Sequence, residues 1–150
     1  MGGVGAGTLR GRMPERHVHR LRVRYRECDQ QGVVFNGHYF SWFDDVFTEA
    51  LRGAGLPYNA IIDAGVDMVV AEASARYRSG ARFDDEVDLH WWVTRLGNTG
   101  MTTRIDVMRE NEILVEGEVR YVFVDAGTTN KRPMPDDIRT KLEPYVSSDG

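Results

Sequence analysis

The chain has 150 residues, a length that suits one ordinary domain, and its 41% hydrophobic and 28% charged residues are typical of a globular protein. Its apolar runs are far shorter than the about 20 residues that a membrane-spanning helix needs, so we expect no membrane partner. The net charge of -4 argues against a protein dedicated to binding nucleic acid.

The charge is unevenly spread, because residues 1–26 carry seven Arg and one Glu and leave residues 27–150 with a net charge of -10. The segment 1–16 contains Gly and Arg but no apolar core, so we expect a disordered leader rather than a secretory signal. One domain is expected over 17–146, followed by a tail at 147–150. The single cysteine, Cys28, excludes an intramolecular disulfide and favours a cytoplasmic location.

The first predicted element is a strand over residues 17–25. Its odd positions, from His17 to Tyr25, are mostly apolar, and the even positions 20, 22, 24 and 26 are all Arg. This strict alternation predicts one apolar face and one cationic face. We expect neighbouring acidic strands, such as the one bearing Glu116 and Glu118, to neutralise the arginines within or between subunits.

The next element is an aromatic helix between residues 36 and 53. Asn36 is the predicted N-cap, and Gly53 and Gly55 supply a stop at the C-terminal end. The helix is predicted from apolar residues spaced by one, three or four positions, which places them on one stripe. They are Tyr39, Trp42, Phe43, Val46, Phe47, Ala50 and Leu51. A short helical segment is expected at 57–64.

The remainder is mostly strand, with candidates at 66–78, 86–95, 101–109 and 113–123 and a short final helix at 136–143. Gly97 to Gly100 is a turn signal, and Gly117 is read as a bulge within the last strand. The pattern predicts an α+β fold in which one curved antiparallel sheet covers a central helix. Such a monomer would leave apolar surface exposed, so we expect oligomerisation.

The loop and helix start at residues 27–39 have the sequence ECDQQGVVFNGHY, with Asp29, Gly32, Val33 and Val34 followed by Phe35, Asn36 and Tyr39. This pattern resembles the acidic-loop motif of the hotdog family of 4-hydroxybenzoyl-CoA thioesterase-like proteins. Trp42 and the segment 72–87 continue the resemblance, which covers about residues 17–125. Many relatives carry His where this chain has Asn36.

The resemblance implies a hotdog fold, with a curved antiparallel sheet of about five strands around a long central helix. It also implies hydrolysis of an acyl thioester carried by coenzyme A or by an acyl carrier protein, with no cofactor. The assembly implied is a homo-oligomer, a dimer or, preferably, a tetramer.

The chemistry of a thioester carbonyl supports this function independently, because it needs a carboxylate nearby and donors for the developing oxyanion. Asp29 follows a strand and precedes the expected helix start by seven residues. We therefore expect Asp29 to be catalytic, either attacking the carbonyl or activating water. The backbone N–H of Asn36 or Gly37 is the expected oxyanion donor, favoured by the helix dipole.

The expected substrate-binding residues are Gly32, Val33, Phe35 and Tyr39 in the motif and Arg76, Arg78 and Arg82 near a strand end. The family uses basic residues at subunit edges to meet coenzyme A phosphates, and the arginine fork suits phosphate. A solvated strand face explains these arginines equally well.

Several side chains leave alternatives open. Glu49 is read as a helix-face charge paired with Arg52 rather than as a second active-site carboxylate, and His38 as a packing or surface residue. No spacing of His, Cys, Asp or Glu indicates a metal site. The competing function is a hotdog module that binds acyl thioesters without turnover. A dehydratase is disfavoured, because His38 lacks the motif surrounding that group's catalytic His.

Overall fold

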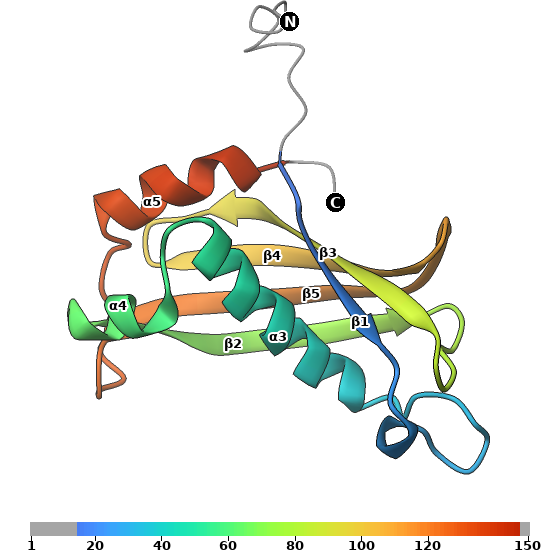
Figure 1. The fold of residues 1–150 in the computed structure, drawn as a ribbon. Coiled ribbons are helices and arrows are strands. Elements are labelled where there is room, and N and C mark those ends of the chain that lie inside the picture. The colour runs from blue at the N-terminus through green and yellow to red at the C-terminus, as the bar shows by residue number, and fades with distance from the viewer. Residues whose placement is uncertain (1–14, 148–150) are drawn as a thin grey trace, which may run out of the picture.

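A computed structural model describes residues 15–147 of the chain (Figure 1). Its strands are β1 (His17–Arg22), β2 (Val66–Tyr77), β3 (Glu86–Leu96), β4 (Gly100–Arg109) and β5 (Glu112–Asp125). Its α-helices are α3 (His38–Gly53), α4 (Tyr58–Asp63) and α5 (Asp136–Leu142), and its 3-10 helices are η1 (Tyr25–Glu27) and η2 (Glu143–Tyr145). These elements confirm the predicted sequence of strand, aromatic helix, four strands and final helix.

The five strands form one antiparallel sheet in the order β1-β3-β4-β5-β2, which leaves β1 and β2 at its edges. Helix α3 lies across one face of the curved sheet (Figure 1). The five-stranded antiparallel sheet covering a helix is as predicted, but α3 has only 16 residues, so the predicted long central helix is not confirmed. None of the helices in residues 15–147 is long and apolar enough to cross a bilayer.

The core lies between α3 and the sheet. The apolar stripe predicted for α3 is the buried face of that helix, which confirms the helical period. Phe47 of α3 stacks on Tyr121 of β5 with ring centroids 4.2 Å apart, and it also contacts Trp91 of β3. The alternate residues of the strands that face α3 complete this core.

Gly117 is not a bulge, contrary to the prediction. It pairs regularly with Ile105 of β4 and Ala75 of β2, and the register shifts of the sheet lie elsewhere. A Cβ added at Gly117 would lie 2.4 Å from Cζ of Phe43, which is closer than two carbon atoms can approach. Glycine therefore makes room for the helix to approach the sheet.

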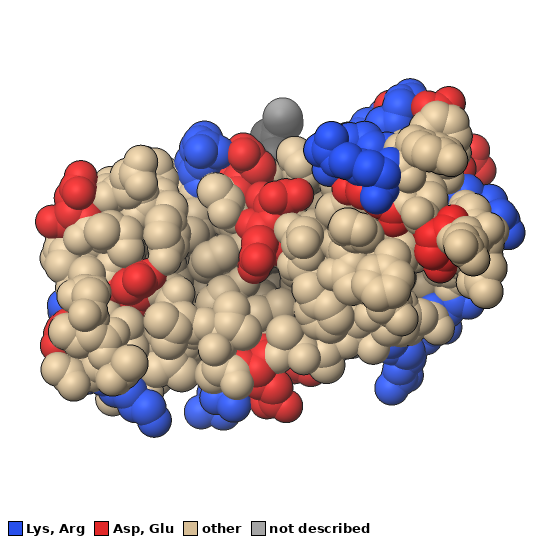
Figure 2. Space-filling model, turned by 90° about the horizontal axis from the view of Figure 1, so that it is seen from below, with Lys and Arg blue, Asp and Glu red and all other residues tan. Residues whose placement is uncertain are grey.

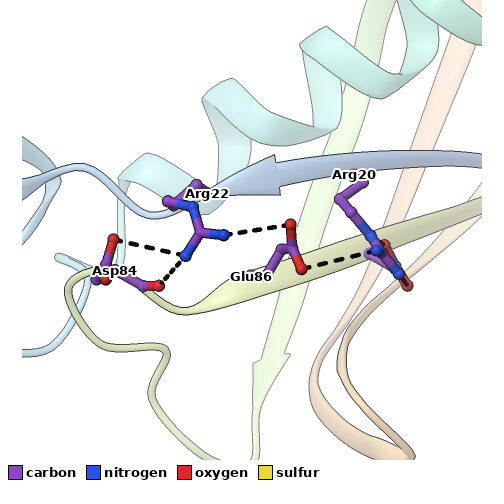
Figure 3. A network of polar contacts seen from close by, with 5 residues as sticks. Arg20, Arg22, Asp84 and Glu86 are labelled. Atoms are coloured by element: carbon purple, nitrogen blue, oxygen red, sulfur yellow. Dashed lines mark hydrogen bonds and ion pairs between the residues drawn. The ribbon is translucent and has the colours of Figure 1, made fainter.

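The first strand is shorter than predicted, since β1 ends at Arg22 and Tyr25 begins η1 with 78% of its surface exposed. Within the chain, the acidic strand that pairs with β1 is β3 and not the strand carrying Glu116. Arg20 binds Asp88 through two hydrogen bonds of 2.8 and 3.1 Å. Figure 3 shows how the neighbouring cationic and acidic side chains continue this network, which links Arg20, Arg22, Asp84 and Glu86.

The start of α3 also differs from the prediction. Gly37, in a helical conformation, is the N-cap residue, and no side chain caps this end. Asn36 instead belongs to a preceding turn, where its carbonyl accepts a hydrogen bond from the Tyr39 N–H at 3.4 Å. The N–H groups of the first turn of α3, which a side-chain cap would serve, already donate to the backbone carbonyls of residues 35–37, so the Asn36 side chain is not needed as a cap.

The predicted leader lies outside the described residues except for its last two positions. The Glu15 N–H donates to the Pro144 carbonyl at 2.9 Å. The guanidinium of Arg16 lies 3.8 Å from the centre of the Trp92 ring, a cation–π contact on the face of the sheet opposite α3.

Candidate active site

Asp29 lies in a tight loop between η1 and α3. Its N–H donates to the Val33 carbonyl at 2.8 Å, and its carbonyl accepts from the Gly32 N–H at 3.0 Å. Gly32 has a φ of +80°, a conformation that favours glycine, which explains this residue in the motif. The loop therefore holds the Asp29 backbone from both sides.

The loop also orients the Asp29 carboxylate. Oδ1 accepts hydrogen bonds from the N–H groups of Gln31 at 2.8 Å and Val33 at 3.4 Å. Within residues 15–147, Oδ2 accepts no hydrogen bond and Asp29 forms no ion pair. One oxygen is thus anchored, and the other is free to act on a ligand.

Two backbone donors remain free at the start of α3. The N–H groups of His38, Tyr39 and Phe40 donate to the carbonyls of residues 35, 36 and 37. In the described part of the chain, the N–H groups of Asn36 and Gly37 have no acceptor. Free N–H groups at a helix start favour bound negative charge.

Asp29 and Asn36 line the same groove, which has a volume of about 460 Å³. The other residues that line it come from the motif and from the end of β2: Val33, Val34, Phe35, Tyr39, Tyr77, Arg78, Ser79 and Gly80. This groove brings a carboxylate and a helix start to one open surface.

Two tyrosines fix the walls of the groove. The Tyr77 hydroxyl donates to the Asn36 carbonyl at 3.2 Å, and the Tyr39 hydroxyl accepts from the Ala81 N–H at 3.1 Å. Burial raises the pKa of Tyr39, so its hydroxyl stays protonated near neutral pH. The two bonds tie the start of α3 to the end of β2 and to the segment that follows it.

The structure places only part of the predicted set in this groove. Gly32 and Gly37 lie beside it as turn and cap residues, and Arg82 lies outside it near Gly32. Arg78 lines the groove but forms an ion pair with Glu116 at 3.2 Å. Arg76 lies with Arg78 in a separate hollow of about 490 Å³ over β2, β4 and β5.

Glu27 was missed by the sequence analysis. It is 4% exposed, two residues before Asp29, and its carboxylate accepts a hydrogen bond from the Trp42 indole at 3.0 Å. Burial raises its pKa, but the hydrogen bonds from Arg24 and Trp42 outweigh burial and lower the pKa to about 2. Its position inside the motif, directly after the alternating arginines of residues 20–26, was the feature of the sequence that could have indicated a paired carboxylate.

The remaining candidates have structural contacts. Glu49 binds Arg52 at 2.7 Å, which confirms the predicted pair on the helix face. His38 is partly buried and packs edge to face against Phe35, with ring centroids 6.1 Å apart. Within residues 15–147, no group of three or more His, Cys, Asp or Glu side chains is arranged to hold a metal ion.

Known proteins resemble this chain in sequence and structure. The acyl-CoA thioester hydrolase YbgC of Escherichia coli is 32% identical over 120 residues, covering 79% of this chain and 89% of the relative. A hypothetical protein of Thermus thermophilus, TT1821, superposes with a TM-score of 0.81 at 32% identity, covering 86% of this chain and 98% of that chain.

A thioesterase superfamily structure from Jannaschia sp. CCS1 has a TM-score of 0.83 over 91% of this chain and 98% of that chain. Its 23% identity shows the fold alone. The profile of the Thioesterase superfamily matches residues 31–116, more than half of the chain and including the start of α3. These matches confirm, at the level of the family, the predicted hotdog thioester hydrolase, and the chain belongs to the thioesterase superfamily.

Proposed function

We propose that the protein hydrolyses acyl-CoA thioesters, with Asp29 as the catalytic carboxylate. The observation that carries the proposal is the shared groove, which is lined both by Asp29, whose carboxylate has one oxygen without a partner in residues 15–147, and by Asn36 at the start of α3. The similarity to a relative named acyl-CoA thioester hydrolase supports coenzyme A as the thiol carrier.

In the proposed reaction the thioester oxygen accepts a hydrogen bond from the free N–H of Asn36 or Gly37. Negative charge develops on that oxygen as the carbonyl carbon is attacked, and the helix start stabilises it. Losing one such donor typically lowers the rate by about 100-fold or more.

Two routes use Asp29 from the same position. In one, its oxygen bonds to the carbonyl carbon while the carbon–sulfur bond breaks and the thiolate leaves, and water then hydrolyses the mixed anhydride. In the other, Asp29 takes a proton from water, the water oxygen attacks the carbon and displaces the thiolate, and the proton passes from Asp29 to the thiolate. Both routes yield a carboxylic acid and free thiol.

The substrate contacts are assigned by position. Val33, Phe35 and Tyr39 line the groove beside Asp29 and supply apolar surface for the acyl end, and Gly32 shapes the loop. The exposed arginines Arg76, Arg78 and Arg82 are the proposed contacts for the coenzyme A phosphates. Arg78 would exchange its ion pair with Glu116 for a phosphate.

The proposed assembly is a homo-oligomer, a dimer or preferably a tetramer, of single domains spanning 17–146. The edge strand β2 exposes Val69, Val70 and Tyr77, apolar surface that a second copy would cover. Figure 2, seen from below, shows a largely uncharged surface, with acidic residues near its middle and also along its edges and with basic residues mainly towards its rim. The single cysteine supports the proposed cytoplasmic location.

The test is a free-thiol release assay on the whole protein with a panel of acyl-CoA substrates, alongside matching acyl carrier protein thioesters. We expect turnover of acyl-CoA esters. Turnover of the carrier-protein esters alone would show that the substrate is carried by an acyl carrier protein and not by coenzyme A. Tight binding without any turnover would contradict the proposal and favour the acyl-thioester binding module.

A further inference from the structure

Glu27 is a buried carboxylate that the proposed chemistry does not use. It closes η1 and stands two residues before Asp29, with only 4% of its surface exposed. A buried charge is costly unless all of its oxygens are well paired. Its partners therefore indicate what this charge holds in place.

The carboxylate has partners on two elements. Oε1 accepts from the Arg24 N–H at 2.8 Å, and Oε2 accepts from the Arg24 guanidinium at 2.7 Å. Oε2 also accepts from Nε1 of Trp42 at 3.0 Å. Arg24 lies just before η1 and Trp42 lies on α3, so one side chain connects the loop that carries Asp29 to the helix.

The backbone of Glu27 closes the same loop. Its carbonyl accepts a hydrogen bond from the Phe35 N–H at 2.9 Å, and the next residue, Cys28, pairs with Val34 in an isolated antiparallel bridge. These contacts hold together the two ends of the loop from Glu27 to Phe35, which contains Asp29. The joined ends of the loop are fixed to α3 by the hydrogen bond from the Trp42 indole to Glu27.

Trp42 is placed to transmit this constraint. It lies five residues after the N-cap Gly37, and its ring packs edge to face on Tyr39 with centroids 5.0 Å apart. Tyr39 in turn anchors the start of α3 to Ala81. The hydrogen bond that the Trp42 indole donates to Glu27 therefore acts on the helix turns next to the free N–H groups.

We propose that Glu27 is a positioning residue, which sets the Asp29 carboxylate against the start of α3 through its hydrogen bond to the Trp42 indole. The inference rests on the proposed function of Asp29. Misplacing a reacting group by about 1 Å can cost about 100-fold in rate, so loss of this bond should lower kcat more than substrate affinity.

The test is Trp42→Phe, which keeps an aromatic ring in the core but removes the donor to Glu27. Trp91→Phe is the matched control, because Trp91 is also fully buried and its indole N–H has no partner within residues 15–147. Glu27→Gln and the double variant Glu27→Gln/Trp42→Phe complete the set. Circular dichroism and thermal melts establish that each variant is folded at the assay temperature.

We expect Trp42→Phe to lower kcat by about 10-fold or more with KM within about two-fold, and Trp91→Phe to leave kcat unchanged. Glu27→Gln keeps an oxygen that can still accept from the Trp42 indole, so it should lower kcat less than Trp42→Phe does, and the double variant should be about as slow as Trp42→Phe. Should Glu27→Gln fail to fold, Trp42→Phe against Trp91→Phe still decides the matter. Equal kcat values for these two folded proteins would overturn the inference.

Asp29→Asn separates this inference from the function on which it rests. If Asp29→Asn is inactive and Trp42→Phe is fully active, the inference about Glu27 is wrong and the proposed role of Asp29 stands. If Asp29→Asn is fully active, the proposed catalytic role of Asp29 is wrong.

Discussion

The ring of Phe43 on α3 fills the space above Gly117 of β5, where an added Cβ would lie 2.4 Å from the ring. Phe43 is 1% exposed and also packs edge to face on Phe40, so its ring has no free volume into which to move. The absence of a side chain at Gly117 therefore allows the helix to pack this close to the sheet.

Gly117→Ala is expected to destabilise the protein by about 1–3 kcal/mol, the usual cost of overpacking a core. Phe43→Leu shortens the opposing side chain, so the double variant should lose less stability than the two single losses added together. Urea unfolding of the four proteins measures this coupling. Strictly additive losses would show that Phe43 is not what requires glycine at this position.

Glu27 should make the stability of the protein depend on acid pH. Its pKa of about 2 in the folded protein lies below the ordinary value of 4.5, so the unfolded chain binds the proton more readily. The stability that Glu27 contributes is complete above about pH 4.5 and is lost as the pH falls towards 2. Glu27→Gln should lack this dependence.

Unfolding free energies measured between pH 7 and pH 2 should therefore show the gap between wild type and Glu27→Gln narrowing towards the acid end. A gap that stays constant over this range would mean that Glu27 is not held as a charged group.

The arginines of β1 should contribute little stability each, because they lie in solvent. Arg20 binds Asp88 and Glu86 with 63% of its side chain exposed. Arg20→Gln should lower the melting temperature slightly at low salt and not at 1 M salt, where charges are screened. Arg26→Gln is the control, since Arg26 is exposed and forms no ion pair within residues 15–147.

If both arginine variants lower the melting temperature equally, or if the lowering by Arg20→Gln persists at 1 M salt, then the ion pairs of Arg20 with β3 are not its cause.

The helices and strands were predictable because their apolar periods are strong. The stripe from Tyr39 to Leu51 fits the buried face of α3, and the turn at residues 97–100 lies between β3 and β4. Contacts between distant elements were not predictable. The pairing of β1 with β3, and the ring of Phe43 above Gly117, depend on tertiary packing that no local pattern encodes.

The candidate site shows the same division. The motif placed Asp29 and Asn36 in sequence, and the structure adds that both border one groove. Tyr77 and Glu27 were missed, because each acts through a partner far along the chain: Tyr77 bonds to Asn36 and Glu27 to Trp42. Asn36 itself was assigned as a cap from its residue type, whereas the backbone turn before α3 removes the need for one.

The most direct test of the account is the rate of thiol release by Asp29→Asn compared with wild type, on the best acyl-CoA substrate. The substitution keeps the size of the side chain and an oxygen to accept from the Gln31 N–H, but removes the charge. We predict that kcat falls by about 100-fold or more while the melting temperature and oligomeric state are unchanged. A correctly folded Asp29→Asn with the kcat of wild type would contradict the central claim.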